Sequence, residues 1–528
     1  MSDSYRVSEH PEGDVELKKV RDYSSGDKPS ELKSADEEVD LERAIELTGF
    51  GWYHIGLIAI CGGILVATVC ETMGVSFVHP AAQCDLALTT VKKGYLSGAM
   101  FLGIVVSANA WGFFADTFGR KNVLLISTIG TWAFSFMSSF SPTTNLFIVL
   151  RFLTGLFCGN QSTVYAYISE FLPTSKRASI ITWTCGFMAI GYLLIPGLAW
   201  LLIPLEVNWD LGFVVYTSWR VYLAAMGLLS FATGFLLPFF PESPKFLMSV
   251  GRKREALNVL RLVYNRNSRN SNVEYPVKNL KSDVHDTPGH VTTPLSFTLQ
   301  GLFKLMWHQT ATLFWPPYGW TTLLFCLIQF GICGTSIGMY IWTPNLLNMI
   351  KSGAGIGATI CELVLANQAN LTLNSASESA DCSSLIRSEV YTSTLVTGVL
   401  FAVAFGTLGG LVVILRKKTV LVSALFLSGI AGFGSYFATN EITVAVLISV
   451  SVVLTGSCST VSNTIAVEVY PTNLRAMVVS LALTIGRLGI ALAGNTIGIL
   501  IESYCDFTLI GLGCVTLLCS LLCILLPE

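Results

Sequence analysis

The stretch Glu170-Phe-Leu-Pro-Thr-Ser-Lys-Arg177-Ala has a second copy later in the chain, Glu468-Val-Tyr-Pro-Thr-Asn-Leu-Arg475-Ala. Both copies read E-x-x-P-T-x-x-R-A, and each follows a long apolar run. Proline stops a helix, and the glutamate near the helix end can accept a hydrogen bond from the arginine in the loop that follows. Five matched positions at equivalent places indicate an internal duplication, which is typical of membrane transporters built from parallel repeats.

The composition indicates that the main solvent of this chain is lipid. Charged residues make up 12% of the 528 residues and hydrophobic residues make up 52%, whereas soluble globular proteins carry about 25% charged residues. A string of soluble domains is therefore excluded, and so are disordered, collagen-like and coiled-coil chains. The net charge of −2 identifies no partner.

Twelve apolar runs are long enough to cross a membrane, because a helix needs about 20 mainly apolar residues to span the hydrocarbon core. They lie near residues 54–78, 94–114, 122–140, 146–168, 178–202, 219–238, 320–348, 391–415, 419–437, 442–466, 476–500 and 507–526. We therefore predict an all-α membrane protein whose twelve transmembrane helices form two pseudo-symmetric six-helix halves.

Four parts follow one another along the chain. Residues 1–50 contain 7 Lys or Arg and 14 Asp or Glu and are predicted to form a disordered acidic tail in the cytosol. Residues 51–238 and 320–526 are the two six-helix halves, and the second half includes an exofacial loop over residues 349–390. Residues 239–319 form a polar central loop on the cytosolic side.

Basic residues in the short loops predict the orientation, because cytosolic loops are enriched in Lys and Arg. With the N-terminus in the cytosol, the cytosolic loops contain Arg120–Lys121, Lys176–Arg177, Arg416–Lys418 and Arg475, and the opposite loops are mainly acidic. We therefore predict a multi-pass protein of the plasma membrane or a vesicle membrane with both termini in the cytosol. In the central loop, residues 245–264 have the pattern of an amphipathic helix that lies on the inner leaflet or braces the two halves.

Two features of the exofacial loop are typical of an oxidising compartment. Cys361 and Cys382 are candidates for a disulfide, since such bonds persist outside the cytosol; two free thiols are the alternative. Asn370 begins an Asn-Leu-Thr sequon, which predicts a glycan on this loop.

The loop between the second and third spans reads Gly112-Phe-Phe-Ala-Asp116-Thr-Phe-Gly119-Arg120-Lys121. It resembles the signature loop of the major facilitator superfamily, G-x-x-x-D-R-x-G-R-[RK], with threonine at the usual basic position. The resemblance implies a latch on the cytosolic face, in which Asp and Arg tie helix ends together and glycines allow close approach. In the second half, only two glycines and a basic run remain of this signature.

Two further motifs strengthen this resemblance. Arg151-Phe-Leu-Thr-Gly-Leu-Phe-Cys-Gly is similar to the R-x-x-x-G-x-x-x-G pattern of the superfamily's fourth span. The stretch Pro241-Glu242-Ser243-Pro244-Lys245-Phe-Leu resembles the P-E-S-P-R-[WF]-L motif that follows the sixth span in sugar-porter-like and organic-ion transporters.

A narrower likeness is carried by residues 77–86, 111–112, 218–221 and 342–344, which resemble the synaptic vesicle glycoprotein 2 family. That family has a long exofacial domain after the seventh span, whereas the loop here has about 40 residues. The chain is therefore expected to be a short-loop relative. The resemblance implies relatives that transport organic ions, and others with no known substrate.

Charged residues inside the spans are the first candidates for a transport site, because a buried charge needs a partner or water. Glu71 lies midway through the first span, and Arg151 in the fourth span is the partner that the family likeness implies. We hypothesise that Glu71 takes up a coupling proton or contacts a cationic group, with Arg151 tuning its proton affinity. A static ion pair that joins two helices is the alternative.

Arg487 in the eleventh span is a second charge within the membrane and a candidate contact for an anionic solute. Its alternative is pairing with backbone carbonyls or a distant acid. Gln329, Asn109 and Tyr165 are polar span residues that either line a cavity or make hydrogen bonds between helices. Tyr165 could also join Trp183 and Trp342 in an aromatic wall around a flat or cationic ligand.

The chain contains no motif of an enzyme, a phosphate-binding loop, a metal site or a cofactor site. The leading interpretation is a secondary transporter of a small organic solute, with an organic ion as the first candidate, that works by alternating access with protons as the candidate coupling ion. One alternative is a non-transporting membrane protein that acts as a binding partner, and another is a sugar carrier. Nucleic-acid binding is excluded, and an oligomer is not required.

Overall fold

The computed structural model describes residues 38–205, 207–268, 274–281, 311, 313–352, 361–362, 386–471 and 474–527. The predicted glycan site at Asn370 and the predicted disulfide residue Cys382 lie outside these ranges.

Each of the twelve predicted spans is helical. The first half contains α2 (Trp52–Met73) continued by α3 (Val75–Ala81), α4 (Thr90–Phe118), α5 (Arg120–Ser139), α6 (Thr144–Cys158) followed by α7 (Gln161–Ser169), α8 (Thr174–Leu202) and α9 (Ser218–Leu236). The second half contains α13 (Gly319–Ser352), α15 (Ser388–Ile414), α16 (Lys417–Phe437), α17 (Glu441–Val469), α18 (Arg475–Ser503) and α19 (Cys505–Ile524).

Ten helical segments within the described ranges are long and apolar enough to cross a membrane. The two predicted spans outside this set are α5 and the α6–α7 pair. Helix α5 opens with two basic residues and is rich in Ser and Thr, which lowers its hydropathy. The α6–α7 span is divided at Gly159 and Asn160 into two shorter helices.

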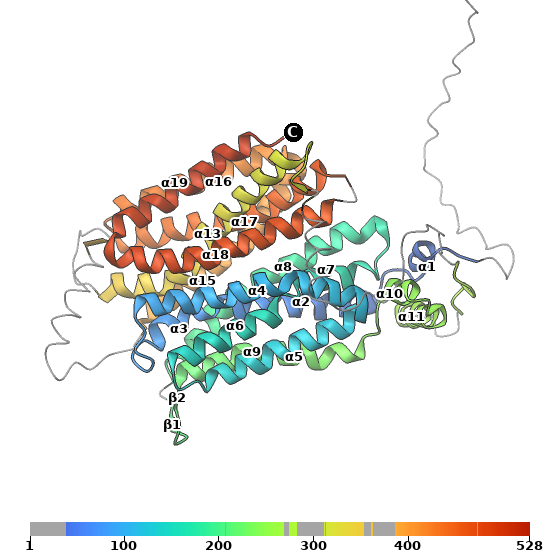
Figure 1. Ribbon diagram of the computed structural model, residues 1–528, viewed down its shortest axis with the longest axis horizontal. Helices are drawn as coiled ribbons and strands as arrows, with labels where there is room; N and C mark the ends of the chain where they lie inside the picture. Colours follow the sequence, from blue (N-terminus) through green and yellow to red (C-terminus); the bar gives the residue numbers. More distant parts are fainter. Residues whose placement is uncertain are drawn as a thin grey trace, which may run out of the picture.

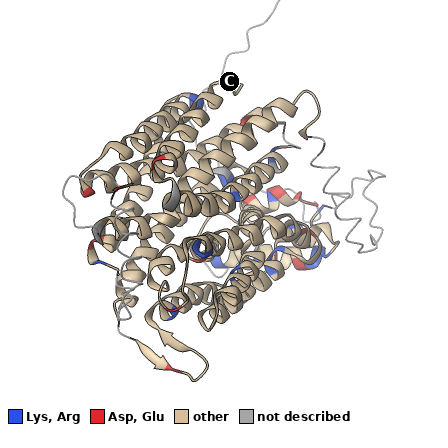
Figure 2. Ribbon diagram, turned by 60° about the vertical axis from the view of Figure 1, so that its left-hand side comes forward, with Lys and Arg blue, Asp and Glu red and all other residues tan. Residues whose placement is uncertain are grey.

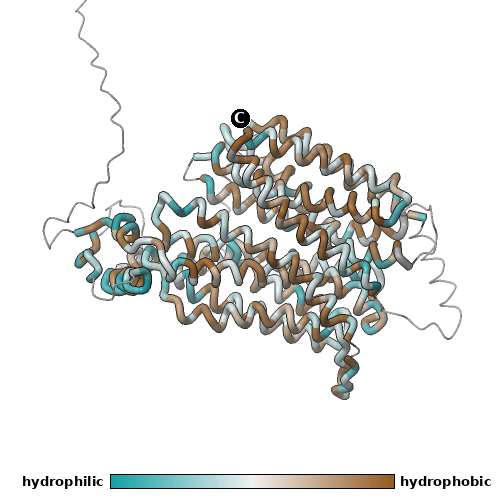
Figure 3. The backbone as a smooth tube through the Cα atoms, turned by 180° about the vertical axis from the view of Figure 1, so that it is seen from behind, coloured by the Kyte–Doolittle hydropathy of each residue, from teal (hydrophilic) through white to brown (hydrophobic). Residues whose placement is uncertain are grey.

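Shorter elements mark the two ends of the bundle. At one end, the "α11 end", lie α1 (Leu41–Leu47), α10 (Pro244–Ser249) and α11 (Lys253–Asn267). At the other, the "hairpin end", the antiparallel strands β1 (Asn208–Asp210) and β2 (Val215–Thr217) pair Trp209 with Tyr216 (Figure 1). Figure 3 shows long apolar stretches along the bundle, and charged residues gather near the helix ends (Figure 2).

The amphipathic segment predicted over residues 245–264 is two helices rather than one. Helices α10 and α11 are separated at Gly251, whose φ of +78° favours glycine. The Asn267 side chain at the end of α11 accepts from Tyr53 N at 3.1 Å and donates to Thr48 O at 3.2 Å. These bonds tie α11 to the start of α2, so this segment lies on the first half.

Glycines allow the closest contact between neighbouring spans. A Cβ added at Gly155 on α6 would lie 2.0 Å from the carbonyl oxygen of Met100 on α4. A Cβ at Gly103 on α4 would lie 2.3 Å from Phe152 O on α6, so the backbones of α4 and α6 are in close contact at both glycines. This approach places Arg151 of α6 directly beside α2 and α4.

Candidate transport site

Glu71 and Arg151 form an ion pair that is buried inside the first half. Arg151 Nη1 lies 3.1 Å from Glu71 Oε2, and the two residues are 0% and 1% exposed. Ser135 Oγ on α5 donates to the same carboxylate oxygen at 2.8 Å. Arg151 Nη2 also donates to the backbone carbonyl of Glu71 and contacts Met100 Sδ at 3.0 Å. The pair therefore joins α2, α4, α5 and α6.

The hydrogen bonding of this pair is incomplete. Glu71 Oε1 and Arg151 Nε are buried and have no hydrogen-bond partner among the described residues. The free oxygen faces α9, since a Cβ added at Gly227 would lie 3.4 Å from it. Because this buried carboxylate oxygen makes no hydrogen bond in the described part of the chain, a proton can bind to it without breaking an existing contact.

Arg487 lies between the two halves. Its Nη2 donates to Gln161 Oε1 on α7 at 2.7 Å. Gln161 Nε2 in turn donates to Tyr165 Oη at 3.4 Å. Within the described residues, no carboxylate lies in ion-pair contact with Arg487, so its charge is met by a neutral amide. The observed partner of Arg487 is therefore neither a backbone carbonyl nor an acid, which were the two partners that the sequence offered as alternatives to a solute.

The other polar candidates are divided among different places. Gln329 on α13 is fully buried and donates to Ser459 Oγ of α17 at 2.5 Å, while its Oε1 has no partner in the part of the chain that the structure describes. Gln329 lies close to the turn of α18 that carries Arg487, because a Cβ added at Gly486, the residue before Arg487, would be 3.1 Å from Gln329 Cγ. Asn109 on α4 is exposed.

The aromatic wall considered for Tyr165, Trp183 and Trp342 does not form. Trp183 is 77% exposed, whereas Trp342 is fully buried and donates to the backbone carbonyl of Gly494 at 3.0 Å. The sequence showed aromatic residues in three spans, but the direction in which each ring points depends on helix rotation.

A charged cluster at the α11 end brings together the signature loop and the first repeat motif. Arg120 Nη2 lies 2.8 Å from Asp116 Oδ1, and Arg120 Nε lies 3.1 Å from Glu170 Oε1. Glu170 therefore pairs with the arginine that opens α5, not with Arg177 as the repeat predicted. Outside its own helix turn, no described heavy atom lies within 4 Å of a Cβ added at Gly112, so none of the described helices approaches closely enough to require a glycine there.

The motif after the sixth span completes this cluster. Glu242 Oε1 accepts from the backbone N of Lys121 at 3.0 Å, at the positive N-terminus of α5. Gly119 has a φ of +97°, and a Cβ there would lie 2.3 Å from Glu242 Oε2. Glycine is thus required at this turn for both backbone and space.

The rest of this motif is structural. Pro241 O accepts from Tyr167 Oη at 2.6 Å. Ser243 Oγ accepts from Phe246 N and caps α10, with Pro244 in its first turn. Lys245 is exposed.

The second half repeats the arrangement of the first. Glu468 pairs with Lys417 at the start of α16, as Glu170 pairs with Arg120 at the start of α5. Arg475 Nε donates to Tyr470 O at 2.8 Å. Arg177 likewise donates to backbone carbonyls, those of Ser169 and Leu172, and also contacts Glu42 Oε1 of α1 at 3.1 Å. The duplication thus preserves the contacts, although the Glu–Arg pairing within each repeat was a wrong prediction.

At the hairpin end, the two halves contact each other directly. Lys93 Nζ of α4 donates to Asn345 Oδ1 of α13 at 2.9 Å. The rings of His79 and Trp342 lie 5.4 Å apart, and a Cβ at Gly98 would lie 2.5 Å from Asn495 Nδ2. Lys93 directly precedes the span predicted over residues 94–114, yet it is 4% exposed, and no local signal links it to a residue in the seventh span.

Motifs that carried the narrower family likeness also meet at this end. Asp85 Oδ2 accepts from Trp219 Nε1 and from Thr217 Oγ1, each at 2.7 Å. Arg220 donates to the carbonyls of Ser139 and Ser141 at 2.7 and 2.8 Å. These contacts fix the start of α9 against the ends of α3 and α5.

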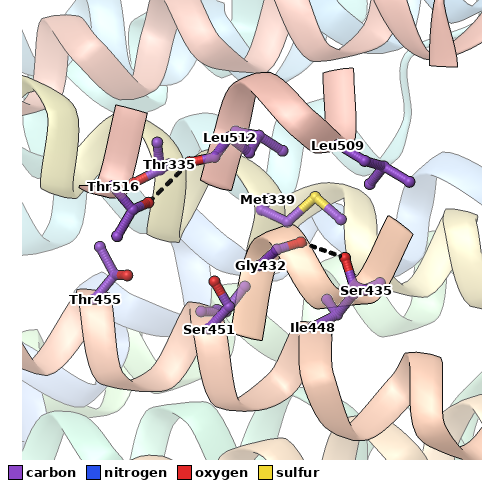
Figure 4. Close-up of a pocket in the computed structure, with 11 residues that line it drawn as sticks. Thr335, Met339, Gly432, Ser435, Ile448, Ser451, Thr455, Leu509, Leu512 and Thr516 are labelled. Carbon is purple, nitrogen blue, oxygen red and sulfur yellow. Dashed lines mark hydrogen bonds between the residues drawn. The ribbon is translucent and has the colours of Figure 1, made fainter. Parts of the chain in front are cut away.

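A small cavity lies within the second half, between α13, α16, α17 and α19 (Figure 4). Hydroxyl groups line it, but Ser435 and Thr516 donate to backbone carbonyls of their own helices at 2.7 and 2.9 Å. Its volume of about 20 Å³ leaves room for about one water molecule. An organic solute does not fit there.

The predicted disulfide between Cys361 and Cys382 is wrong in its pairing. Cys361 is bonded to Cys505, the first residue of α19. Cys84 is disulfide-bonded as well. A loop cysteine can reach any helix start at the same end of a bundle, so the nearest cysteine in sequence had no geometric advantage.

Comparison with known proteins identifies the family. The profile of the family described as "Sugar (and other) transporter" matches residues 43–337. The chain belongs to this family. It is therefore classed with membrane transporters rather than enzymes, and the predicted membership of the major facilitator superfamily is confirmed.

Relatives of the chain include synaptic vesicle glycoprotein 2C from Mus musculus, which is 29% identical over 357 residues, covering 65% of this chain and 48% of that protein. Synaptic vesicle glycoprotein 2B from Homo sapiens is 29% identical over 327 residues, covering 59% of this chain and 47% of that protein. The chain thus spans about half the length of the curated relatives it matches.

Solved structures confirm the fold. The partially occluded inward-open conformation of the xylose transporter XylE from E. coli superposes with a TM-score of 0.62 at 15% identity, covering 89% of this chain and 96% of that one. A D-xylose–proton symporter gives a TM-score of 0.61, also at 15% identity, covering 89% and 97%. The predicted all-α, two-half architecture is that of the major facilitator fold.

Proposed function

We propose that this protein is a secondary transporter of a small organic anion, and that the anionic group of the solute contacts Arg487. The observation that carries this is the position of Arg487 between the halves, where a neutral amide is its hydrogen-bond partner. A charge at membrane depth is costly unless it is compensated. A carboxylate that displaced Gln161 would supply that compensation through a charge-assisted hydrogen bond.

The location also suits alternating access. Gln161 belongs to the first half and Arg487 to the second, so a solute bound at both would contact both moving bodies. In the major facilitator fold, transport is a rocking of one half against the other about a central site. The buried Gln329 amide near Gly486, with its oxygen unpartnered, offers a further acceptor for a solute hydroxyl or ammonium group. Tyr165 is a candidate third contact.

We further propose that Glu71 carries the coupling proton. Its pair with Arg151 lies wholly within the first half and has no exposed surface, so a proton reaches it only when the helices separate. Protonation would remove the counterion of Arg151 and loosen the tie between α2 and α6. The same pair would then respond to the pH on whichever side the site faces.

The contacts between halves at the hairpin end support an inward-facing arrangement, if that end is exofacial as the loop charges predict. Both termini and the α11 end would then lie in the cytosol. The two charged clusters, Arg120 with Glu170 and Lys417 with Glu468, would act as cytosolic latches that tighten or open during the cycle.

Uptake into proteoliposomes tests the transport proposal. Labelled aromatic and aliphatic monocarboxylates, organic cations and hexoses are compared with and without an inward proton gradient. We expect saturable carboxylate uptake that Arg487→Gln lowers at least about tenfold, the equivalent of one charge-assisted hydrogen bond. Gln161→Glu should be equally harmful, because it places an internal carboxylate on Arg487.

The control is Arg254→Gln, which removes an exposed charge from α11 and should leave uptake unchanged. Uptake of hexoses alone would refute the anion proposal in favour of a sugar carrier. Absence of uptake for every solute class, with the purified protein still folded, would favour the non-transporting alternative.

A further inference from the structure

The β1–β2 hairpin carries apolar side chains out of the bundle. It connects the end of α8 at Leu202 to the start of α9 at Ser218, and both helices are long and apolar enough to cross a membrane. Within the part of the chain that the structure describes, Trp209 is 62% exposed and Phe213 is 64% exposed, and Leu211 between them is exposed as well. Clustered apolar side chains on a surface mark a contact with a membrane or with another protein.

The direction of the hairpin distinguishes between these two kinds of contact. It extends sideways from the bundle rather than along the helices (Figure 1 and Figure 3). Because membrane-spanning helices run across the bilayer, a segment that leaves their ends sideways lies along the membrane surface. The hairpin is therefore placed to contact lipid, whereas a segment that continued along the helices would enter water.

Aromatic rings connect the hairpin to an exposed face of α5. The ring of Trp209 is stacked on that of Tyr216, with 6.4 Å between centroids, and the Tyr216 ring lies 5.0 Å from that of Phe140. Phe140 follows α5, and its ring lies 5.2 Å from that of Phe136, which is exposed and is stacked on Trp132. We call these five rings the aromatic row. Trp and Tyr are enriched where a membrane meets water, since their rings are partly apolar and partly polar.

We propose that the β1–β2 hairpin is a membrane-interface anchor. In this arrangement Trp209, Leu211 and Phe213 lie among the head groups and upper acyl chains of the leaflet at the hairpin end. The aromatic row makes this contact continuous with the lipid-facing surface of α5. Burial of these side chains in the interface removes their apolar surface from water, which is the driving force for the contact.

The charges of this segment indicate that the contact does not depend on anionic head groups. Residues 203–217 contain no Lys or Arg and two acidic residues, Glu206 and Asp210. Attraction to anionic lipids requires basic residues near the membrane surface. Asp210 Oδ1 accepts from the backbone N of Gly212 at 2.8 Å, so this carboxylate takes part in the turn itself. The anchor should consequently bind zwitterionic lipid as well as anionic lipid.

The base of the hairpin is fixed to the first half. Thr217 at the end of β2 contacts Asp85, and the hydroxyl groups of Tyr216 and Ser139 lie 3.2 Å apart. These contacts join the hairpin to the ends of α3 and α5. An anchor attached in this way would hold the first half at a constant depth in the membrane while the second half turns against it, whatever solute is carried.

Spin-label accessibility in the full-length protein tests the anchor. A nitroxide is attached at Phe213→Cys in a background that carries Cys185→Ser and Cys514→Ser, and the signal of the unsubstituted background is subtracted. In phosphatidylcholine nanodiscs, power saturation measures collisions with oxygen, which concentrates in lipid, and with a water-soluble nickel chelate. We expect a ratio of oxygen to nickel collisions several-fold higher at residue 213 than at the matched label Arg254→Cys, on the exposed side of α11.

Trp209→Ala, added to the labelled protein, should lower the ratio at residue 213 towards that at residue 254, because it removes the outermost ring of the aromatic row. An unchanged ratio would refute the role of this row in anchoring. Equal ratios at residues 213 and 254 without that substitution would place the hairpin in water and overturn the proposal.

Two further outcomes would also overturn the anchor. Few collisions with either reagent at residue 213 would mean that protein covers the hairpin, either a second copy of the chain or residues 363–385, which lie outside the described ranges. A high ratio that appears only when the nanodiscs contain phosphatidylserine would show that anionic head groups hold the hairpin, contrary to its lack of basic residues.

Discussion

Replacing Glu71 by Gln measures whether the buried pair is ionised. The substitution keeps the size of the side chain, so Ser135 and Arg151 still have an oxygen to contact at 2.8 and 3.1 Å. It leaves the Arg151 guanidinium buried without a counterion. Breaking a buried pair in this way costs about 3–5 kcal/mol of unfolding free energy, and the retained amide oxygen places the expected loss near the lower value, about 3 kcal/mol.

The unfolding free energy is measured by SDS titration of the protein in mild detergent, with far-ultraviolet circular dichroism as the signal. Ser135→Ala is the matched variant, because it removes one hydrogen bond to the carboxylate and leaves both charges. We expect it to cost about 2 kcal/mol, less than Glu71→Gln. Arg151→Met combined with Glu71→Gln removes both charges, so the double variant should be more stable than the sum of the single losses predicts.

Two outcomes would contradict this reasoning. A Glu71→Gln protein as stable as wild type, together with additive losses in the double variant, would show that the carboxyl is already neutral beside Arg151. In proteoliposomes, full retention of gradient-driven uptake by Glu71→Gln would remove the proposed role of Glu71 as the proton carrier.

Two more predictions concern contacts outside the membrane core. Gly119→Ala should lower the unfolding free energy by about 2 kcal/mol because of its φ of +97° and the nearby Glu242 carboxylate. Gly112→Ala, with open space around it, should be nearly neutral in the same titration, and equal losses would refute the steric reason. Cys505→Ser should free Cys361, so alkylation of the denatured, non-reduced protein should add one label relative to wild type. A label count lower by one would show that this disulfide does not form, because both cysteines would then be labelled in the wild type.

The architecture could be predicted from the sequence because it depends on patterns that lipid imposes on every span. Apolar runs of about 20 residues gave the helices, and the repeat around Glu170 and Glu468 gave the two halves. The α6–α7 break was not predicted, since Gly159 and Asn160 are also tolerated inside continuous helices of membrane proteins.

Contacts between distant residues were harder to predict. The sequence suggested that Glu170 pairs with Arg177, seven residues away, but the structure brings Arg120 to it from the start of α5. The partner of Arg487 is Gln161, a neutral residue in the other half, and nothing in the local sequence identifies it. Such pairings depend on helix rotation and on how the halves meet, which periodicity does not determine.

The covalent bond between Cys361 and Cys505 joins two segments of a single moving body. One cysteine follows α13 and the other opens α19, so both travel with the second half when it turns against the first. The bond therefore opposes separation of the end of α13 from the start of α19, but it sets no limit on the angle between the halves. Loss of this bond alone in Cys505→Ser should consequently shorten the lifetime of the folded protein while leaving the turnover of each intact molecule unaltered.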